Sequence, residues 1–180
     1  ITPSHQFPTG HIMPVSRRIQ LLNWSNERPR RYIIEDDYDS EFRYAGKPIP
    51  SLQGLDHNGK VIYLGAFSKS LSPALRISYL VLPEHLLAAY RQQLSFYICP
   101  VPTIEQKTLQ RFIDEGHFER HLNRMRNIYK QKRETMVSVI RELLPQAEIQ
   151  GASAGLHVTL CVNNGMSEQE LIAAYPHERE

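Results

Sequence analysis

The chain has 180 residues, of which 41% are hydrophobic and 22% charged, and its formal net charge is +2. This composition is that of a soluble globular protein and excludes disorder throughout, and the small net charge does not indicate a nucleic-acid-binding surface. No apolar run reaches the ~18 residues of a membrane helix and no signal peptide is visible, so we expect one domain, or one and part of a second.

The first sixty residues predict strand segments on either side of one helix. Residues 1–6 are typical of a strand end, and the letters FPTG that follow are typical of a turn. Apolar residues recur at helical spacing from Ile12 to Trp24. The letters YIIEDDY (32–38) indicate a short buried strand that leads into a loop of acidic residues, and residues 39–60 carry turn chemistry.

Two further strands and two helices are expected next. The letters VIYLGAF (61–67) and RISYLVL (76–82) each predict a strand. Pro83 opens a helix that runs to about Phe96. A capping box of Thr103 and Gln106 begins the next helix, and Gly116 ends it.

The last third of the chain begins with one long amphipathic helix, because apolar residues keep helical spacing over residues 117–144 until Pro145. The letters AEIQGASAGLHVTLCV (147–162) predict two short strands around a glycine turn. A final helix is expected after Ser167, which serves as its N-cap.

This order of elements predicts an α/β fold in three layers. Strands that are apolar throughout alternate with helices, which is typical of a mostly parallel sheet covered on both faces. After the long helix the pattern changes to short strands followed by a helix. We therefore expect the start of a smaller C-terminal α+β subdomain there.

The chain ends and the cysteines carry two further expectations. The sequence opens at Ile1 without an initiating methionine and stops just after a short helical pattern, so we expect a piece of a longer chain. Cys99 and Cys161 both lie in apolar surroundings, which favours buried free thiols over a disulfide. Free thiols fit a reducing cytoplasm.

Lys69 follows an apolar strand and is the first candidate for chemistry, since functional groups collect at the carboxyl ends of strands in open α/β sheets. A desolvated lysine is a nucleophile that forms Schiff bases with carbonyls. Arg76 suits a phosphate, Asp36 suits a cationic ring nitrogen, and Tyr38 shares a face with Asp36 in extended chain. A carbonyl, a phosphate and a ring nitrogen together describe pyridoxal 5′-phosphate (PLP).

The letters SHQFPTG, EDDYDSEF and FSKSLSPALRISY together resemble the aminotransferase-like body of MocR-type (GabR-like) transcriptional regulators. Those proteins join a GntR-type winged-helix head to a fold-type-I PLP-dependent body. The resemblance makes Lys69 the Schiff-base lysine and Asp36 the partner of the pyridine nitrogen. It places Tyr38 on the phenolic oxygen, and Arg76 and Ser68 near the phosphate.

The resemblance also implies a domain organisation and a dimer. Residues 1–116 would be part of the PLP-binding large domain, residues 117–145 the connecting helix, and residues 146–180 part of the small subdomain.

Phe7 and Ala66 depart from ordinary aminotransferases, which often have an asparagine at the first position and a hydroxyl residue at the second. Ala66 weakens the expected binding of the phosphate. The family's phosphate loop, stacking aromatic residue and carboxylate-binding arginine have no counterpart in this chain.

Each of these residues also has a plain structural interpretation. Lys69 alone would be an ordinary loop lysine, Asp36 and Asp37 turn caps, Tyr38 a packing residue and Arg76 half of an ion pair. Asp37 is assigned to capping. His5 is left open between the cofactor and a hydrogen-bonded turn, and His157 is expected to pack in the small subdomain.

Two patterns on the long helix are interpreted as surface. His117 and His121 have the i, i+4 spacing of a metal pair but lack a third ligand nearby. The basic series is interpreted as a solvated face rather than a DNA stripe; it consists of Arg120, Arg124, Arg126, Lys130, Lys132 and Arg133.

Three functions remain open. The preferred one is the effector domain of a PLP-dependent transcriptional regulator, which senses an amino compound and acts on DNA through a head absent from this chain. The second is an active class I/II aminotransferase in which Lys69 also moves a proton. The third is a fragment unable to hold PLP.

Overall fold

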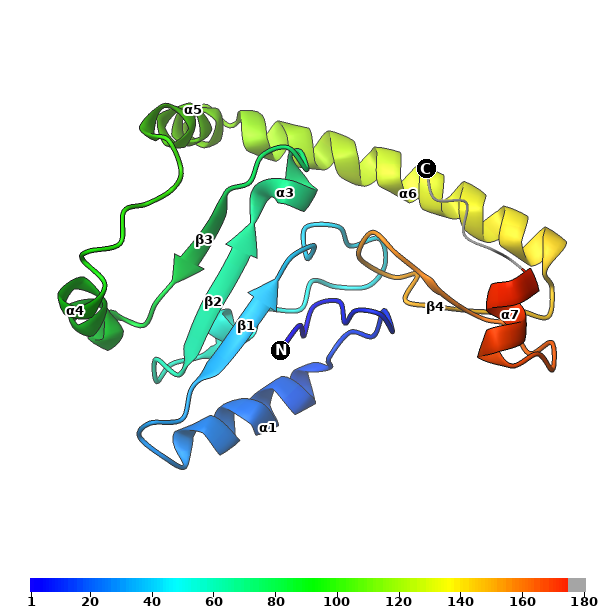
Figure 1. The fold of residues 1–180 in the computed structure, drawn as a ribbon, viewed down its shortest axis with the longest axis horizontal. Coiled ribbons are helices and arrows are strands. Elements are labelled where there is room, and N and C mark those ends of the chain that lie inside the picture. Colours follow the sequence, from blue (N-terminus) through cyan, green and yellow to red (C-terminus); the bar gives the residue numbers. More distant parts are fainter. Residues whose placement is uncertain (175–180) are drawn as a thin grey trace.

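The computed structural model describes residues 1–174, and its centre is a three-stranded sheet with the order β1-β2-β3 (Figure 1). Strands β1 (Ile33–Asp37) and β2 (Val61–Ala66) are parallel, whereas β3 (Ser78–Val81) pairs with β2 in the antiparallel sense. The α/β class is confirmed and the sheet is mixed. The physical reason is the short connection, since residues 67–77 are fewer than the roughly dozen residues that a parallel crossover needs.

One face of the sheet carries the core. Ile33 of β1 and Val61 of β2 pack against Leu22 of α1 (Val15–Asn26) and Leu52 of α2 (Leu52–Leu55), and all four are buried. Each such side chain contributes roughly 1.5–3 kcal/mol relative to its exposed form. The short helix α2 was not predicted.

The other face of the sheet is open within residues 1–174, so the cover expected on this face is not found in this part of the chain. Ile34 of β1 is 53% exposed and Leu80 of β3 is 45% exposed. No helix in this part of the chain packs over them. Residues 1–6 form no strand element, but the Ile1 amine donates to the Ile34 carbonyl at 2.8 Å, and the Ile1 carbonyl accepts from the Asp36 N–H at 2.8 Å.

Three helices follow β3, namely α4 (Glu84–Gln93), α5 (Thr103–Asp114) and α6 (His117–Leu143). Gly116 separates α5 from α6 with a φ of +71°, as its predicted role requires. The predicted capping box is wrong. Pro102 is the N-cap residue, and the Gln106 amide donates to the Val101 carbonyl at 2.8 Å instead.

Helix α6 runs from α3 (Phe67–Ser70), a turn of helix that was not predicted, toward the C-terminal part of the chain (Figure 1). Phe118 packs edge-on against Phe67. Two members of the basic series are not solvated as expected. Arg126 donates to the Glu41 carbonyl at 2.6 Å, and Arg133 donates to the Ala152 carbonyl.

The C-terminal part holds the antiparallel strands β4 (Glu148–Gln150) and β5 (Thr159–Cys161) and helix α7 (Glu168–Ala174). Ser167 caps α7 as predicted, because its hydroxyl accepts from the Glu170 N–H at 3.4 Å while the Glu170 carboxylate accepts from the Ser167 N–H at 2.7 Å. The predicted domain boundaries stay a prediction, and the end of the last segment, 175–180, lies outside the described residues.

Both cysteines are free as expected, but Cys99 and Cys161 are exposed rather than buried. Cys99 lies in the irregular segment between α4 and α5, and Cys161 ends the edge strand β5, so neither meets the core. Within residues 1–174, no helix combines the length and the apolar character needed to cross a membrane.

Candidate functional site

The carboxyl ends of β1 and β2 lie side by side, because the two strands are parallel and Asp37 is in register with Gly65. Asp36 is the penultimate residue of β1, and Lys69 lies in α3 immediately after β2. Both side chains are exposed. The structure thus brings the predicted carboxylate and amine to one edge of the sheet, although the surrounding residues of this chain do not remove the Lys69 amine from water.

Asp36 and Asp37 have different surroundings. Asp37 is buried, and its Oδ2 accepts a hydrogen bond from the Tyr63 hydroxyl at 2.8 Å. Burial, together with the Asp37 carboxylate, raises the pKa of Tyr63 well above its usual range. The assignment of Asp37 to turn capping is therefore wrong, because its side chain is committed to a partner on the neighbouring strand.

Tyr38 follows β1, and its hydroxyl donates to the His5 carbonyl at 2.7 Å. Burial, with smaller contributions from the Asp39 and Asp36 carboxylates, raises the pKa of Tyr38 to about 12. The phenol is therefore neutral at physiological pH and keeps a proton to donate. Because this proton is engaged by the His5 carbonyl, the phenol would have to give up that bond before it could donate to an acceptor oxygen on a bound molecule.

Ser68 and Arg76 lie at the two ends of the loop that joins β2 to β3. The Phe67 N–H donates to the Ile77 carbonyl at 3.0 Å, which closes the base of the loop. The Ser68 hydroxyl donates to the Leu75 carbonyl at 3.1 Å, so it is already engaged. Arg76 is exposed, and the ion pairs found within residues 1–174 do not include it.

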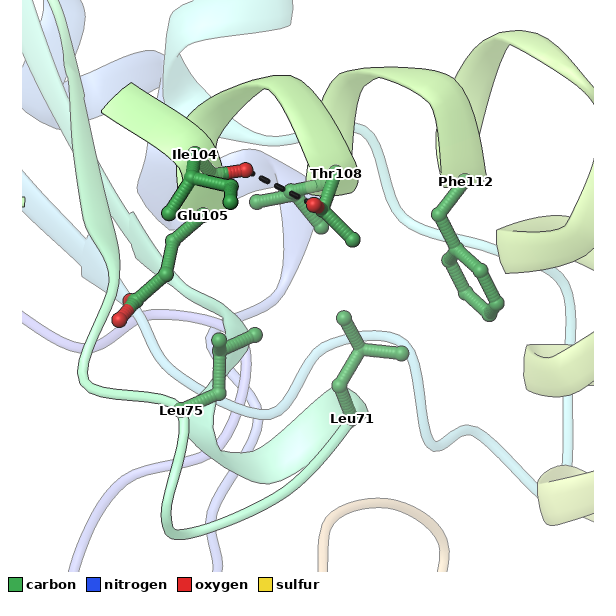
Figure 2. Close-up of a pocket in the computed structure, with 7 residues that line it drawn as sticks. Leu71, Leu75, Ile104, Glu105, Thr108 and Phe112 are labelled. Atoms are coloured by element: carbon green, nitrogen blue, oxygen red, sulfur yellow. Dashed lines mark hydrogen bonds between the residues drawn. The ribbon is translucent and has the colours of Figure 1, made fainter. Parts of the chain in front are cut away.

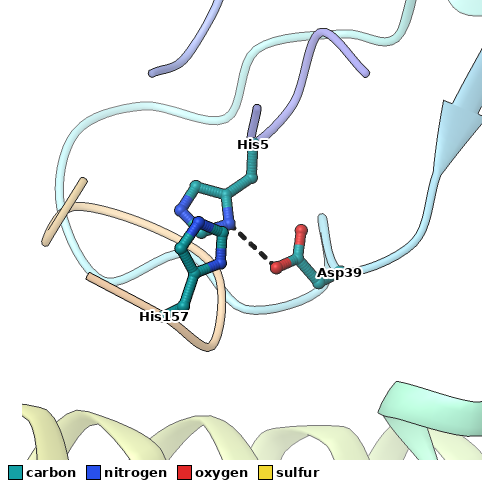
Figure 3. Close-up of side chains that lie close together, drawn as sticks. All are labelled: His5, Asp39 and His157. Carbon is teal, nitrogen blue, oxygen red and sulfur yellow. Dashed lines mark hydrogen bonds and ion pairs between the residues drawn. The ribbon is translucent and has the colours of Figure 1, made fainter. Parts of the chain in front are cut away.

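A cluster of three side chains adjoins these residues, namely His5, Asp39 and His157 (Figure 3). His5 Nδ1 lies 2.9 Å from Asp39 Oδ2, and the rings of His5 and His157 lie 4.1 Å apart between centroids. Burial lowers the pKa of His157; the neighbouring His5 adds to this, and the Lys69 charge acts in the same direction. His5 is thus the buried, hydrogen-bonded residue of the two alternatives, and His157 packs against the large part of the chain rather than within the small subdomain.

Sequence analysis missed Asp39 altogether. The only available signal was a polar residue in the acidic loop, which does not distinguish a buried partner from a surface turn. His5 and His157 stand at opposite ends of the chain, so local patterns could not pair them.

A buried ion pair, Arg18 with Glu35, holds together the backbone segments next to the site. Arg18 Nη1 lies 3.7 Å from Glu35 Oε1. The Glu35 carboxylate accepts the N–H groups of Leu52 and Gln53, each at 2.9 Å. Burial raises the pKa of Glu35 despite these bonds and lowers that of Arg18. The Arg18 guanidinium also donates to the backbone carbonyls of Pro3, Met13 and Pro50. The pair therefore fixes the segments that enter the site.

An apolar cavity of about 320 Å³ lies between the loop after α3 and helix α5 (Figure 2). Leu71, Leu75 and Phe112 face it, and the Thr108 hydroxyl is turned back to the Ile104 carbonyl at 2.8 Å. Its lining contains one acidic residue, Glu105, and no cationic side chain for a phosphate. A polar cavity of about 510 Å³, lined by Asp37, Tyr63 and Arg126 among others, opens on the face of the sheet that carries Asp37.

The remaining histidines on α6 do not form a metal pair. His117 contacts the Glu115 carboxylate at 3.3 Å and Arg120, whereas His121 Nε2 lies 3.0 Å from the Ser70 carbonyl. His117 is exposed, as expected of a surface residue, whereas His121 is partly buried, so its interpretation as surface is wrong. His121 contributes instead to the packing of α6 on α3.

Comparison with known proteins gives matches along nearly the whole chain. The sequence family described as aminotransferase class I and II matches residues 1–174. An uncharacterised HTH-type transcriptional regulator of Bacillus subtilis, YdeL, is 50% identical over 173 residues, which cover 96% of this chain and 37% of that protein. The probable rhizopine catabolism regulatory protein MocR of Rhizobium meliloti is 42% identical over 144 residues, which cover 80% of this chain and 29% of that protein.

Solved structures give the same picture. A multiple substrate aminotransferase from Thermococcus profundus superposes with a TM-score of 0.82 at 30% identity, covering 97% of this chain and 43% of that one. The kynurenine aminotransferase of Pyrococcus horikoshii superposes with a TM-score of 0.83 at 29% identity, covering 96% of this chain and 43% of that one. The chain thus spans little more than a third of the length of the first curated relatives and less than half of these enzymes.

Proposed function

The chain belongs to the aminotransferase class I and II family, and on that premise we propose that it is part of the effector-sensing body of a MocR-type transcriptional regulator. The fold-type-I architecture that the resemblance implied is confirmed by the structural neighbours. The same family and neighbours imply PLP as the cofactor. In the proposed role, the body binds a small amino compound while a separate head binds DNA.

The residues of this chain fit that cofactor by the chemistry of their donor set. When bound, PLP supplies a carbonyl that condenses with amines and a ring nitrogen that draws electrons from the attached carbon. The exposed Lys69 amine is available for covalent attachment, and the exposed Asp36 carboxylate is available to hold a proton on the ring nitrogen. The neutral Tyr38 phenol could donate to the phenolic oxygen once it gives up its bond to the His5 carbonyl.

The phosphate contact rests on Arg76. Its guanidinium is exposed and is bound to no acid within residues 1–174, so it is available for an oxyanion. Ser68 would have to give up its bond to the Leu75 carbonyl before it could donate to the same group. We therefore assign the main phosphate contact of this chain to Arg76 and a secondary one to Ser68.

The observation that carries the proposal is the placement of Asp36 and Lys69 at the carboxyl ends of two adjacent parallel strands. An amino compound that takes the place of the Lys69 amine would free this side chain. His157, on the loop between β4 and β5, belongs to the cluster with His5 and Asp39 that adjoins Tyr38. We propose that the freed side chain changes the body near this loop and that a homodimer carries the change to DNA.

A test uses the full-length protein loaded with PLP. We expect the visible absorption band of lysine-bound cofactor, and borohydride reduction followed by peptide mass spectrometry should locate the label on Lys69. Lys69→Ala should abolish both signals, whereas Lys47→Ala, which removes another exposed lysine, should keep them. A band that persists in Lys69→Ala, or a label on a different lysine, would refute the assignment.

An active aminotransferase is the second candidate, favoured by structural neighbours that are aminotransferases at 29–32% identity. In that case the freed Lys69 amine would also move a proton to and from the bound substrate. Amino-acid turnover distinguishes the two. A sensor should change its affinity for DNA when an amino compound is added, with at most a single turnover, whereas an enzyme should convert substrate over many turnovers.

A further inference from the structure

Three segments that are far apart in the sequence contribute side chains to one point in the structure. His5 comes from the turn before α1, Asp39 from the loop after β1, and His157 from the loop between β4 and β5 (Figure 3). One ligand atom from each residue lies within 4.8 Å of the other two. His5 and Asp39 are each 1% exposed, and His157 is half-buried.

The cluster is left with unused polar atoms. Asp39 Oδ2 contacts His5 Nδ1 at 2.9 Å and accepts from the Leu156 N–H at 3.3 Å. No hydrogen-bond partner within residues 1–174 is found for Asp39 Oδ1, His5 Nε2 or His157 Nε2, although all three atoms are buried. Buried polar atoms are normally satisfied, and a bound ion would satisfy several of them in this cluster at once.

We propose that His5, Asp39 and His157 form a binding site for a first-row transition-metal dication. Two imidazoles and one carboxylate are ligands that suit Zn²⁺ and its neighbours, and three protein ligands leave one position open for water or a small molecule. The single carboxylate also supplies negative charge in a buried place where a dication would otherwise be costly.

The distances permit such a site with little movement. Ligand atoms at about 2.0–2.2 Å from a tetrahedral Zn²⁺ stand roughly 3.3 Å apart. His5 Nδ1 and Asp39 Oδ2 lie 2.9 Å apart, close to that value, and a metal bound by these two atoms would replace the hydrogen bond between them. His157 would need a shift on the order of 1 Å, because the separations within the cluster reach up to 4.8 Å.

The backbone holds two of the three ligands together. Gly155 has a φ of +72°, and a Cβ at this position would overlap the His5 ring. The Gly155 N–H donates to the Phe42 carbonyl at 2.6 Å, and the Tyr44 N–H donates to the Ser153 carbonyl at 3.0 Å. These contacts hold the loop that carries His157 against the segment that follows Asp39.

The test is a calorimetric titration of the full-length protein, freed of metal and of PLP, with Zn²⁺. We expect a binding event that His157→Phe and Asp39→Asn each weaken at least about tenfold, while His117→Phe, on the surface of α6, leaves it unchanged. Substitution with Co²⁺ should give visible absorption bands of nitrogen and oxygen ligation in the wild type but not in His157→Phe. These measurements are made without cofactor, so their outcome is independent of the proposed function.

Folding of the variants is checked by circular dichroism and thermal unfolding. Zn²⁺ should raise the unfolding temperature of the wild type and of His117→Phe, but not that of folded His157→Phe. The proposal is overturned if the wild type binds no Zn²⁺, or if folded His157→Phe binds it as tightly as the wild type. If Asp39→Asn fails to fold, His157→Phe and His5→Phe decide the question.

Discussion

Asp36 and Asp37 are consecutive residues of β1 whose side chains lie on opposite faces of the sheet: Asp36 is exposed, and Asp37 is buried against the Tyr63 hydroxyl at 2.8 Å. Alternation along a strand produces this division. The covered face belongs to the core that contains Ile33 and Val61. The two carboxylates therefore serve different purposes, one available to a bound molecule and one to the fold.

The first prediction tests whether Asp36 serves cofactor binding and Asp37 serves stability. Asp36→Asn should weaken PLP binding by about 10- to 100-fold, because a charge-assisted contact to the ring nitrogen is worth roughly 1.5–3 kcal/mol. Its unfolding free energy without cofactor should stay within about 0.5 kcal/mol of the wild type, since the side chain is exposed. Asp37→Asn should show the reverse, with lower stability and nearly unchanged affinity. Equal losses of affinity in both variants would contradict the assignment.

Tyr63→Phe should destabilise the protein by roughly 1.5–3 kcal/mol, because the buried Asp37 carboxylate then loses its hydrogen-bond donor. Tyr32→Phe is the matched control. Its hydroxyl makes a similar 2.8 Å bond, to His85, but in an exposed place, so its effect should stay within about 0.5 kcal/mol. Urea unfolding of both variants measures the difference, and comparable losses would argue against a special role for the Asp37 contact.

Gly155→Ala should disrupt the contact between the C-terminal loop and the turn at His5. The added methyl group meets the His5 ring, and the φ of +72° is itself unfavourable for alanine. Gly165→Ala isolates the second effect, because Gly165 has a φ of +75° but nothing within 4 Å of the added carbon. We expect about 1 kcal/mol for Gly165→Ala and several times that for Gly155→Ala, measured by denaturant unfolding. The prediction fails if the two variants lose the same stability.

Arg18→Met should cost about 3–5 kcal/mol, since it leaves the buried Glu35 carboxylate without its counter-charge. Arg17→Met, the exposed neighbour on the same helix, should have little effect. Burial raises the pKa of Glu35, so the Glu35 carboxyl binds a proton more tightly in the folded protein than in the unfolded chain. Part of the stability lost in Arg18→Met should therefore return as the pH is lowered from neutrality, and a loss that grows on acidification would contradict this account.

The start of α7 supplies a prediction about pH. Bonds from the Ser167 N–H and hydroxyl lower the pKa of the Glu170 carboxyl. The cap therefore stabilises α7 above the ordinary pKa of a glutamate and is lost as the pH falls through the lowered value. Ser167→Ala removes the hydroxyl bond and should move the Glu170 pKa back toward its ordinary value, as followed by NMR of the carboxyl carbon. No movement would show that the backbone N–H alone sets this pKa.

Much of the fold could be predicted from local patterns. The helical spacing over 117–144 matches α6 (His117–Leu143), and the apolar letters of β1 and β2 mark two strands of the sheet. The antiparallel direction of β3 was also within reach, since the connection of residues 67–77 is too short for a parallel crossover. The capping box at Thr103 failed because Pro102 already takes the cap position.

The candidate site was predicted in its residue types more than in its surroundings. An amine after β2 and a carboxylate at the end of β1 follow from the order of strands, since parallel strands present their carboxyl ends at one edge. The engagement of the Ser68 hydroxyl by Leu75 could not be foreseen, because a hydroxyl finds its partner only when the loop has closed. The burial of Arg18 and Glu35 was likewise invisible, since charged residues are usually exposed.

The sequence by itself determined the longer helices, the strands of the sheet and the chemical groups at their ends, because periodicity and turn chemistry act over neighbouring residues. Only the tertiary structure decided that Asp36 faces outward while Asp37 is buried, and that His5 meets Asp39 and His157. Alternation divides a strand into two faces without stating which face the rest of the chain will cover. Contacts across more than a hundred residues depend on how the whole chain closes, which no local pattern records.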